Sequence, residues 1–144
     1  MPIKQTTPSE ASRWLEQGYR YIDVRTEQEF ANGHPSGALN IPVAMPNPQT
    51  GQMALNADFV AVVSAHFAKD AKLVVGCQAG GRSQRAAEML AQAGYTDVAN
   101  MQGGFGGGQD DFGRAIPGWA ASGLPVSRDC PAADSYAALS GKPK

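Results

Sequence analysis

Short apolar runs alternate with amphipathic segments along most of the chain, and this alternation is the strongest constraint on its fold. Strands are expected at residues 19–24, 38–41, 73–76 and 97–101, and helices at 8–18, 26–32, 58–68 and 83–93. Strands that alternate with helices favour an α/β fold whose mostly parallel sheet is covered by helices on both faces.

Local signals set the ends of several expected helices. Residues 7–10 (TPSE) and 26–29 (TEQE) are capping boxes, in which a Thr side chain and a Glu three residues later satisfy free backbone N–H groups. Pro8 stands at the first helical position, where its missing N–H costs nothing. Gly18 and Gly94 are expected to end their helices.

The remaining segments contain mostly turn-forming residues. Residues 45–52 and 103–113 are expected to be loops, and Trp119 is expected on a short final helix that ends before Gly123. The length of 144 residues suits one domain, placed at residues 1–126. Residues 127–144 form a polar, Ala-rich tail that either packs on the domain or is flexible.

Composition excludes several classes of function. A formal net charge of −1 gives no general attraction to nucleic acid or to an anionic membrane, and no apolar run has the length of a membrane span. The start of the chain has neither an apolar signal segment nor an Arg-rich transit peptide, so a cytoplasmic location is expected, or an organelle if a presequence has been removed. His34 and His66 are far apart in the sequence from each other and from the cysteines, so no metal ion or cofactor is expected.

Cys77 stands where an expected buried strand gives way to a Gly-rich loop and a helix. Ligands of parallel sheets gather at the carboxyl ends of the strands, and a helix start presents free N–H groups and a positive dipole. Glycines let successive amides turn toward one centre, which stabilises a thiolate there. We therefore expect Cys77 to be a nucleophile; the alternative is a buried structural cysteine. Cys130 has no such setting and is interpreted as an incidental thiol, with a resolving role as the alternative.

Three charged residues are expected near the same edge of the sheet. Arg82 opposes the helix dipole in the first turn, which is explained if an anion is bound nearby or if Arg82 pairs with a carboxylate. Asp23 and Arg25 end a neighbouring strand, where they form either a structural ion pair or a supporting part of the site.

Several motifs together resemble the rhodanese-type sulfurtransferases. Residues 77–83 (CQAGGRS) are similar to the active-site loop of that family. Residues 21–25 (YIDVR), followed by Glu29 and Phe30, are similar to its first motif. Residues 33–42 (GHPSGALNIP) resemble a further family segment, with Pro35 in place of the usual apolar residue. The closing pattern is found in Gly94-Tyr95, Gly103-Gly104, Trp119 and residues 123–126, so the resemblance spans residues 7–126.

The resemblance implies a rhodanese-like fold with a central, mostly parallel five-stranded sheet and helices on both faces. It also implies that Cys77 carries sulfur as a persulfide, from a donor such as thiosulfate to cyanide or a thiol, with a thioredoxin-like protein among the acceptors to consider. The implied substrate-binding loop supplies amides and side chains from Gln78, Ala79, Gly80, Gly81, Arg82 and Ser83. It implies no oligomeric state.

Two other classes of function remain open. Members of the same fold that are phosphatases or arsenate reductases carry five residues between Cys and Arg, whereas this chain has four between Cys77 and Arg82. A regulatory or sulfur-relay binding module is the other alternative, although the presence of Cys77 in an intact loop argues against a purely non-catalytic module.

Residues 105–118 depart from the family pattern by separating the Gly-Gly pair from Trp119. Because this segment leaves a strand at the expected active edge, we expect it to border the site, with Phe105 and Phe112 as an apolar rim. Asp110 and Asp111 would then repel anionic donors or attract a basic acceptor. The alternative is a surface insertion without functional consequence.

Overall fold

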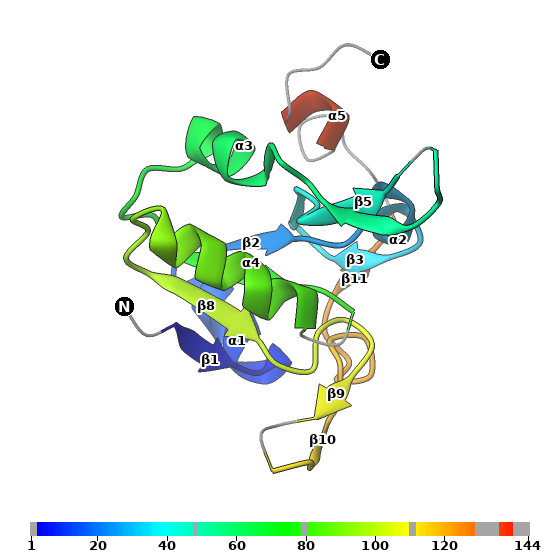
Figure 1. Ribbon diagram of the computed structural model, residues 1–144. Coiled ribbons are helices and arrows are strands. Elements are labelled where there is room, and N and C mark those ends of the chain that lie inside the picture. The colour runs from blue at the N-terminus through cyan, green and yellow to red at the C-terminus, as the bar shows by residue number, and fades with distance from the viewer. Residues whose placement is uncertain (1–2, 48, 79–80, 110–111, 129–135, 140–144) are drawn as a thin grey trace.

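A five-stranded parallel sheet forms the centre of the molecule (Figure 1). The computed structural model describes residues 3–47, 49–78, 81–109, 112–128 and 136–139. The strand order is β1-β8-β7-β2-β4, and every neighbouring pair is parallel. The strands are β1 (Lys4–Thr6), β2 (Arg20–Asp23), β4 (Leu39–Asn40), β7 (Leu73–Gly76) and β8 (Val98–Met101).

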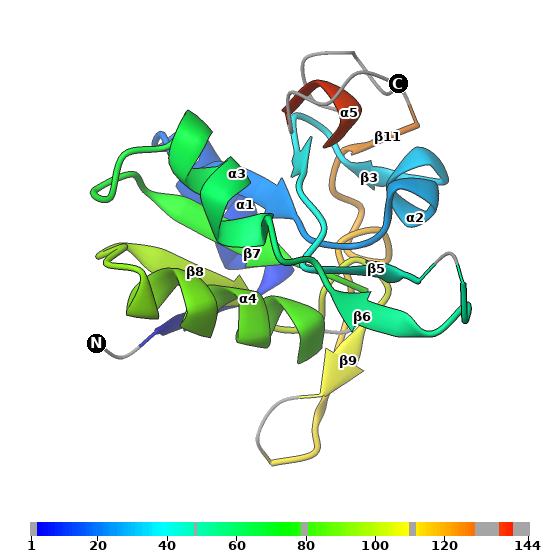
Figure 2. The same ribbon diagram turned by 45° about the horizontal axis from the view of Figure 1, so that its top comes forward.

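Helices cover both faces of this sheet, as Figures 1 and 2 show from two directions. They are α1 (Pro8–Glu16), α2 (Glu27–Ala31), α3 (Phe59–His66), α4 (Gly81–Gln92) and α5 (Tyr136–Leu139). One core packs α3, α4 and α5 against the sheet, and a second core packs α1 and α2 against the other face. The predicted α/β fold, with five strands and helices on both faces, is confirmed.

Both predicted N-caps form, but only the second predicted capping box is complete; at the first, the return hydrogen bond from the Glu10 side chain to the Thr7 N–H is not formed. The Thr7 side chain accepts a hydrogen bond from the Glu10 backbone, and Thr26 with Glu29 forms a complete capping box. The helix after Cys77 starts at Gly81, two residues before the predicted start at residue 83. Gly81 and Arg82 therefore belong to the first turn of α4 rather than to the preceding loop.

Three pairings arise where the sequence predicts loops or no element. β1 is a three-residue strand that pairs with β8 along its whole length, and its short, mostly polar sequence gives no strand signal. β5 (Ala44–Pro46) and β6 (Met53–Leu55) form an antiparallel hairpin across the predicted 45–52 loop. β3 (His34–Pro35) pairs with β11 (Val126–Ser127), which joins the last part of the predicted domain to its first third.

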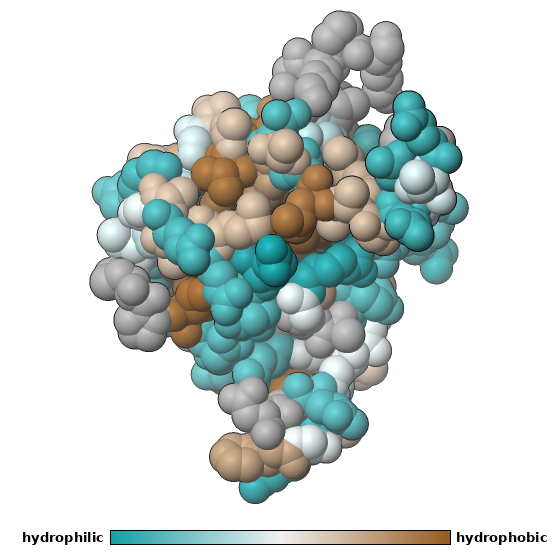
Figure 3. Space-filling view, in the orientation of Figure 1, coloured by the Kyte–Doolittle hydropathy of each residue, from teal (hydrophilic) through white to brown (hydrophobic). Residues whose placement is uncertain are grey.

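The hairpin of β5 and β6 leaves apolar side chains in contact with solvent. Met53 and Leu55 of β6 are each about half exposed. The space-filling view in Figure 3 shows apolar patches in the upper part of this face, above a mostly polar lower part. The half-buried Met45 of β5 packs instead on the core shared with α3 and α4.

The segment after β8 is partly regular. It contains an antiparallel hairpin of β9 (Gly108–Gln109) and β10 (Ala115–Ile116), which extends away from the sheet in Figures 1 and 2. The short helix predicted around Trp119 is wrong, since residues 119–123 form hydrogen-bonded turns. Trp119 instead packs in the α1 and α2 core, and its indole N–H donates to the Pro125 carbonyl at 2.6 Å.

Part of the C-terminal tail belongs to the core. Tyr136 and Leu139 of α5 are buried against the sheet face that carries α3 and α4. The Asn56 side chain donates to the Tyr136 hydroxyl at 2.9 Å, and His66 Nε2 lies 2.6 Å from the Leu139 carbonyl oxygen. The domain boundary at residue 126 stays a prediction. Among the described helices, none is long and apolar enough to cross a membrane.

Ending the chain at Ser127 tests that boundary. Because the shortened chain lacks the buried side chains of Tyr136 and Leu139, we expect the free energy of unfolding to fall by at least about 2 kcal/mol, measured by urea denaturation. Tyr136→Phe removes only the hydroxyl and is the control, with a loss of about 1 kcal/mol expected. A shortened chain as stable as the full chain would show that α5 contributes nothing to folding.

Candidate active site

Cys77 directly follows β7 at the carboxyl edge of the sheet. Its side chain is buried, and Gly76 before it is paired with Asp23 of β2. The chain enters α4 at Gly81, so the amides of Gly81, Arg82 and Ser83 lie in the first helical turn, where they lack partners within the helix. Ala79 and Gly80, the middle of the predicted loop, lie outside the described residues.

The segment after β8 holds the backbone of the cysteine loop. The Phe105 amide donates to the Cys77 carbonyl at 2.8 Å, and the Gly106 amide donates to the Gln78 carbonyl at 2.9 Å. Gly104 has φ +57°, and a Cβ there would collide with the Cys77 carbonyl oxygen. Both backbone conformation and space therefore require glycine at this position. The expectation that this segment begins beside Cys77 is confirmed.

A buried polar contact reaches the cysteine sulfur from α4. The Ser83 hydroxyl lies 3.4 Å from Cys77 Sγ and donates to Asn100 Oδ1 at 2.5 Å. Ser83 and Asn100 are both buried. Ser83 is among the site residues expected from the sequence, whereas Asn100 is not; its signal is a polar residue inside an otherwise apolar strand.

Asp23 and Arg25 form a buried ion pair. Their closest contact is 2.8 Å, and the Arg25 backbone N–H also donates to Asp23 at 3.0 Å. The guanidinium donates further to the Gly33 carbonyl at 2.6 Å and to Gln78 Oε1 at 3.2 Å, and it lies over the Phe105 ring. The pair ties β2 to the cysteine loop, and the supporting role of Asp23 and Arg25 stays a prediction.

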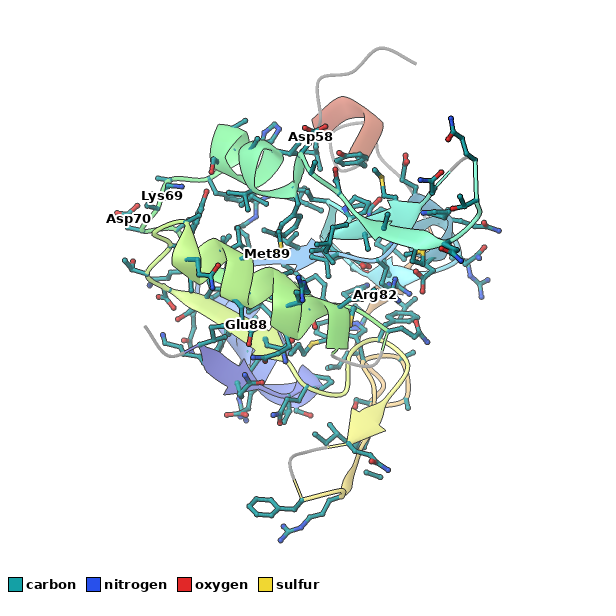
Figure 4. The ribbon with its side chains drawn as sticks, in the orientation of Figure 1. Asp58, Lys69, Asp70, Arg82, Glu88 and Met89 are labelled. Carbon is teal, nitrogen blue, oxygen red and sulfur yellow. The ribbon has the colours of Figure 1, made fainter. Side chains whose placement is uncertain are left out.

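Arg82 pairs with a carboxylate, the second of its two predicted explanations. Its guanidinium makes two hydrogen bonds to Glu29, of 2.7 and 3.0 Å, which link the start of α4 to α2. Figure 4 places Arg82 at this end of α4. The hydrogen bond from Arg82 is the main cause that lowers the pKa of Glu29 to about 2, and the same contact raises the pKa of Arg82.

An open pocket lies beside the cysteine loop. Its volume is about 360 Å³, and its lining residues are Arg25, Glu29, Asn32, Gly33, Gln78 and Phe105. Polar groups and one aromatic ring thus face the same space, which suits a small polar ligand. Since the two ion pairs beside it are internally balanced, the pocket carries no large net charge from them.

Several predicted residues lie elsewhere. Phe112 is 82% exposed and contacts Arg114 beyond the β9 and β10 strands, so its predicted place on the rim of the site is wrong. His34 is buried, stacks on Phe30 and contacts the Phe30 carbonyl oxygen at 2.7 Å through Nδ1. Asp110, Asp111 and Cys130 lie outside the described residues. Within the described part of the chain, no His, Cys, Asp and Glu side chains cluster as metal ligands would.

These features define an α/β domain whose cysteine follows a central parallel strand and faces the first turn of a helix. A family profile described as "Rhodanese-like domain" matches residues 7–111. The chain belongs to the rhodanese-like domain family, as its sequence motifs predicted.

Curated relatives support the same assignment. The chain is 42% identical over 109 residues to "Thiosulfate sulfurtransferase 16, chloroplastic" of Arabidopsis thaliana, which covers 76% of this chain and 80% of that protein. It is 31% identical over 126 residues to "Thiosulfate sulfurtransferase GlpE" of Haemophilus influenzae, covering 88% and 96%. "Protein HIGH ARSENIC CONTENT 1, mitochondrial" of Arabidopsis thaliana is 45% identical over 95 residues, covering 66% of this chain and 55% of that protein. The chain thus spans little more than half of that last relative.

Solved structures share the fold. A crystal structure of Rv0390 from M. tuberculosis superposes with a TM-score of 0.71 at 27% identity, covering 90% of this chain and all of that one. The rhodanese-like domain of the Alr3790 protein from Anabaena sp. superposes with a TM-score of 0.64 at 21% identity, covering 88% and 79%.

Replacement of Gly104 by Ala tests the contact between the two loops. Gly104→Ala adds a Cβ against the Cys77 carbonyl, so we expect a loss of about 3 kcal/mol of stability and loss of Cys77 reactivity toward iodoacetamide. Gly113→Ala is the matched control, because Gly113 also has positive φ but no atom within 4 Å of the added Cβ. Equal losses in the two variants would show that backbone conformation alone, and not the contact, decides the outcome.

The ion pair between Glu29 and Arg82 should make the stability of the protein depend on pH. Since the folded pKa of Glu29 is about 2 against an ordinary value of 4.5, the pair stabilises the protein above pH 4.5 and loses this effect as the pH falls toward 2. We expect carboxyl ¹³C NMR to give a Glu29 midpoint near 2, and Arg82→Gln to move it toward 4.5. Arg85→Gln, at an exposed position of α4, should leave the midpoint unchanged.

Proposed function

We propose that this protein is a sulfurtransferase that moves sulfane sulfur from thiosulfate, or a similar anionic donor, through a Cys77 persulfide to cyanide or a thiol. The observation that carries the proposal is the place of Cys77, at the end of β7 and against the first turn of α4, in a chain of the rhodanese-like family. Relatives named thiosulfate sulfurtransferase point to the same donor.

In the first half of the reaction the Cys77 thiolate attacks the outer sulfur of thiosulfate. A new S–S bond forms at Cys77, the S–S bond of thiosulfate breaks, and its electron pair leaves with sulfite. In the second half cyanide or a thiolate attacks the outer sulfur of the persulfide. The Cys77 thiolate then departs, and thiocyanate or a new persulfide is released.

Negative charge remains on sulfur at Cys77 before and after each transfer. The first-turn amides of Gly81, Arg82 and Ser83 and the dipole of α4 favour an anion at this place. The Ser83 hydroxyl lies 3.4 Å from the sulfur and can donate to an anion there if its proton turns away from Asn100. Gln78, Ala79 and Gly80 complete the proposed binding loop. Arg82 is the proposed attractor of the donor, with its charge balanced by Glu29 in the free protein.

The pocket beside Gln78 is the proposed entry for the acceptor. Its mixed lining of amide, guanidinium, carboxylate and Phe105 ring suits a small polar thiol. A thioredoxin-like protein remains a proposed alternative acceptor. The proposed location is the cytoplasm, or an organelle in a form that carries a presequence; one relative is named as chloroplastic and another as mitochondrial.

Arsenate reduction is a second candidate function. The relative named "Protein HIGH ARSENIC CONTENT 1, mitochondrial" has 45% identity over the matched residues, which supports testing this class. The four-residue spacing between Cys77 and Arg82 argues for sulfur transfer, since a shorter ring of amides suits one sulfur atom better than a tetrahedral oxyanion.

Mass spectrometry after thiosulfate treatment tests the proposal. We expect one added sulfur atom, mapped to Cys77, and a loss of thiocyanate formation by at least about 10³-fold in Cys77→Ser, because the carrier of the persulfide is removed. Cys130→Ser is the control and should retain both signals. Substantial transfer by Cys77→Ser would refute the mechanism, and arsenate-dependent turnover without sulfur uptake would favour the second candidate.

A further inference from the structure

A chain of polar side chains runs from the cysteine to the surface at the edge of the sheet. Ser83 lies between Cys77 and Asn100, and Asn100 Nδ2 donates to Gln5 Oε1 at 3.0 Å and to Gln84 Oε1 at 3.1 Å. The Gln5 side chain also donates to Gln84 Oε1 at 2.8 Å. Residues of β1, β8 and α4 thus join in one network that ends at the reactive sulfur.

The number of protons on Ser83 and Asn100 determines which group donates in each hydrogen bond of this network. A serine hydroxyl has a single proton, and Asn100 Oδ1 can only accept. At 2.5 Å from Asn100 and 3.4 Å from sulfur, the Ser83 proton is directed to Asn100. The Ser83 oxygen then presents lone pairs to Cys77, an arrangement that accepts a hydrogen bond from a thiol and gives none to a thiolate.

An anionic sulfur needs the opposite arrangement. Ser83 can donate to a thiolate or persulfide only if its proton turns away from Asn100. The buried Asn100 Oδ1 then loses its hydrogen-bond donor and faces a lone pair of the Ser83 oxygen, which is unfavourable. Rotation of the Asn100 amide removes that conflict, because Nδ2 then donates to the Ser83 oxygen. Asn100 Oδ1 would turn toward Gln5 and Gln84, whose amides each carry donors as well as an acceptor.

We propose that Asn100 is a positioning residue that reverses the hydrogen bond of Ser83 when Cys77 becomes anionic, through rotation of its side-chain amide against Gln5 and Gln84. The role in sulfur transfer rests on the proposed function. The coupling to the charge on Cys77 does not, because it applies to the thiolate itself. Asn100 touches no substrate and acts only through Ser83.

The charged and titratable groups around Cys77 come from elements other than β8, the strand that carries Asn100. Tyr21, Asp23 and Arg25 lie on or directly after β2, and Arg82 lies on α4 and is paired with Glu29. Burial raises the pKa of Tyr21 well above its ordinary value, so this side chain stays neutral. None of these groups contacts Asn100 through a described hydrogen bond, so substitution of Asn100 leaves their ion pairs in place.

Asn100→Asp tests the direction of the hydrogen bond. A carboxylate has the shape of the amide but only accepts, so it holds the Ser83 proton away from sulfur. We expect the pH midpoint of Cys77 alkylation to rise by at least about one unit, which is a tenfold lower rate below the midpoint. Asn100→Leu removes the acceptor Asn100 Oδ1, so residue 100 no longer holds the Ser83 proton away from sulfur and the midpoint should not rise.

A Ser83→Ala background separates the hydroxyl from a direct effect of charge. We expect Asn100→Asp to shift the midpoint by less than half as much in this background, since the proposed route through Ser83 is gone. An equal shift in both backgrounds would overturn the proposal, as would an unchanged midpoint in Asn100→Asp or a rise of the same size in Asn100→Leu.

NMR of the unsubstituted protein tests the same step without a core substitution. The side-chain ¹⁵N–¹H signals of Asn100 should shift with the same pH midpoint as Cys77 alkylation, and should not do so in Cys77→Ser. Signals that stay constant through the ionisation of Cys77 would overturn the proposal. If sulfur transfer itself fails, mass spectrometry shows no persulfide, whereas both midpoints remain measurable.

Discussion

Two backbone hydrogen bonds hold the cysteine loop, and the rest of the site depends on them. Phe105 and Gly106 donate to the carbonyls of Cys77 and Gln78, so these carbonyls face the segment after β8. Because these two carbonyl oxygens already have hydrogen-bond donors on that side, the chain that follows can enter the first turn of α4. The close approach requires a residue without a side chain at Gly104, which couples the strand pair β7 and β8 to the position of Cys77.

Two ion pairs also lie beside the loop. Asp23 and Arg25 are almost fully buried, and Arg25 extends to Gln78, whereas Arg82 and Glu29 are about one-third exposed and join α4 to α2. The buried pair is costly to break because one charge would be left without its partner. The exposed pair is screened by solvent and contributes less to stability. Of the two ion pairs, the one between Asp23 and Arg25 therefore contributes more to the position of the loop.

The sequence predicted those parts of the fold that local patterns control. Such patterns act between residues that are near each other in the sequence, so a single sequence is enough to interpret them. They include the capping residues Thr7 and Thr26, the apolar run of β7 and the glycines around Cys77. β1 and the β5–β6 hairpin depend on pairing with distant strands, and Lys4–Thr6 has no apolar signal of its own.

The candidate site shows the same division. Cys77 and its loop were identified from their own motif, and Glu29 was identified from a capping box and from the first family motif, with no role in the site. Its pairing with Arg82 joins residues that are far apart in the sequence, as does the contact of Ser83 with Asn100. Trp119 was misplaced because its role is burial in the second core, where turns suffice and no helix is needed.

The contact between Cys77 and the segment after β8 also bears on how the protein is made. A ribosome synthesises Cys77 well before Gly104, Phe105 and Gly106, and the neighbouring strand β8 emerges in between. Until that strand has paired and its glycine turn has docked, the loop lacks the partners that orient it, and Cys77 resembles an ordinary thiol of an unfolded chain. Under the proposed function, the site around Cys77 is therefore complete only after the nascent chain has folded around it.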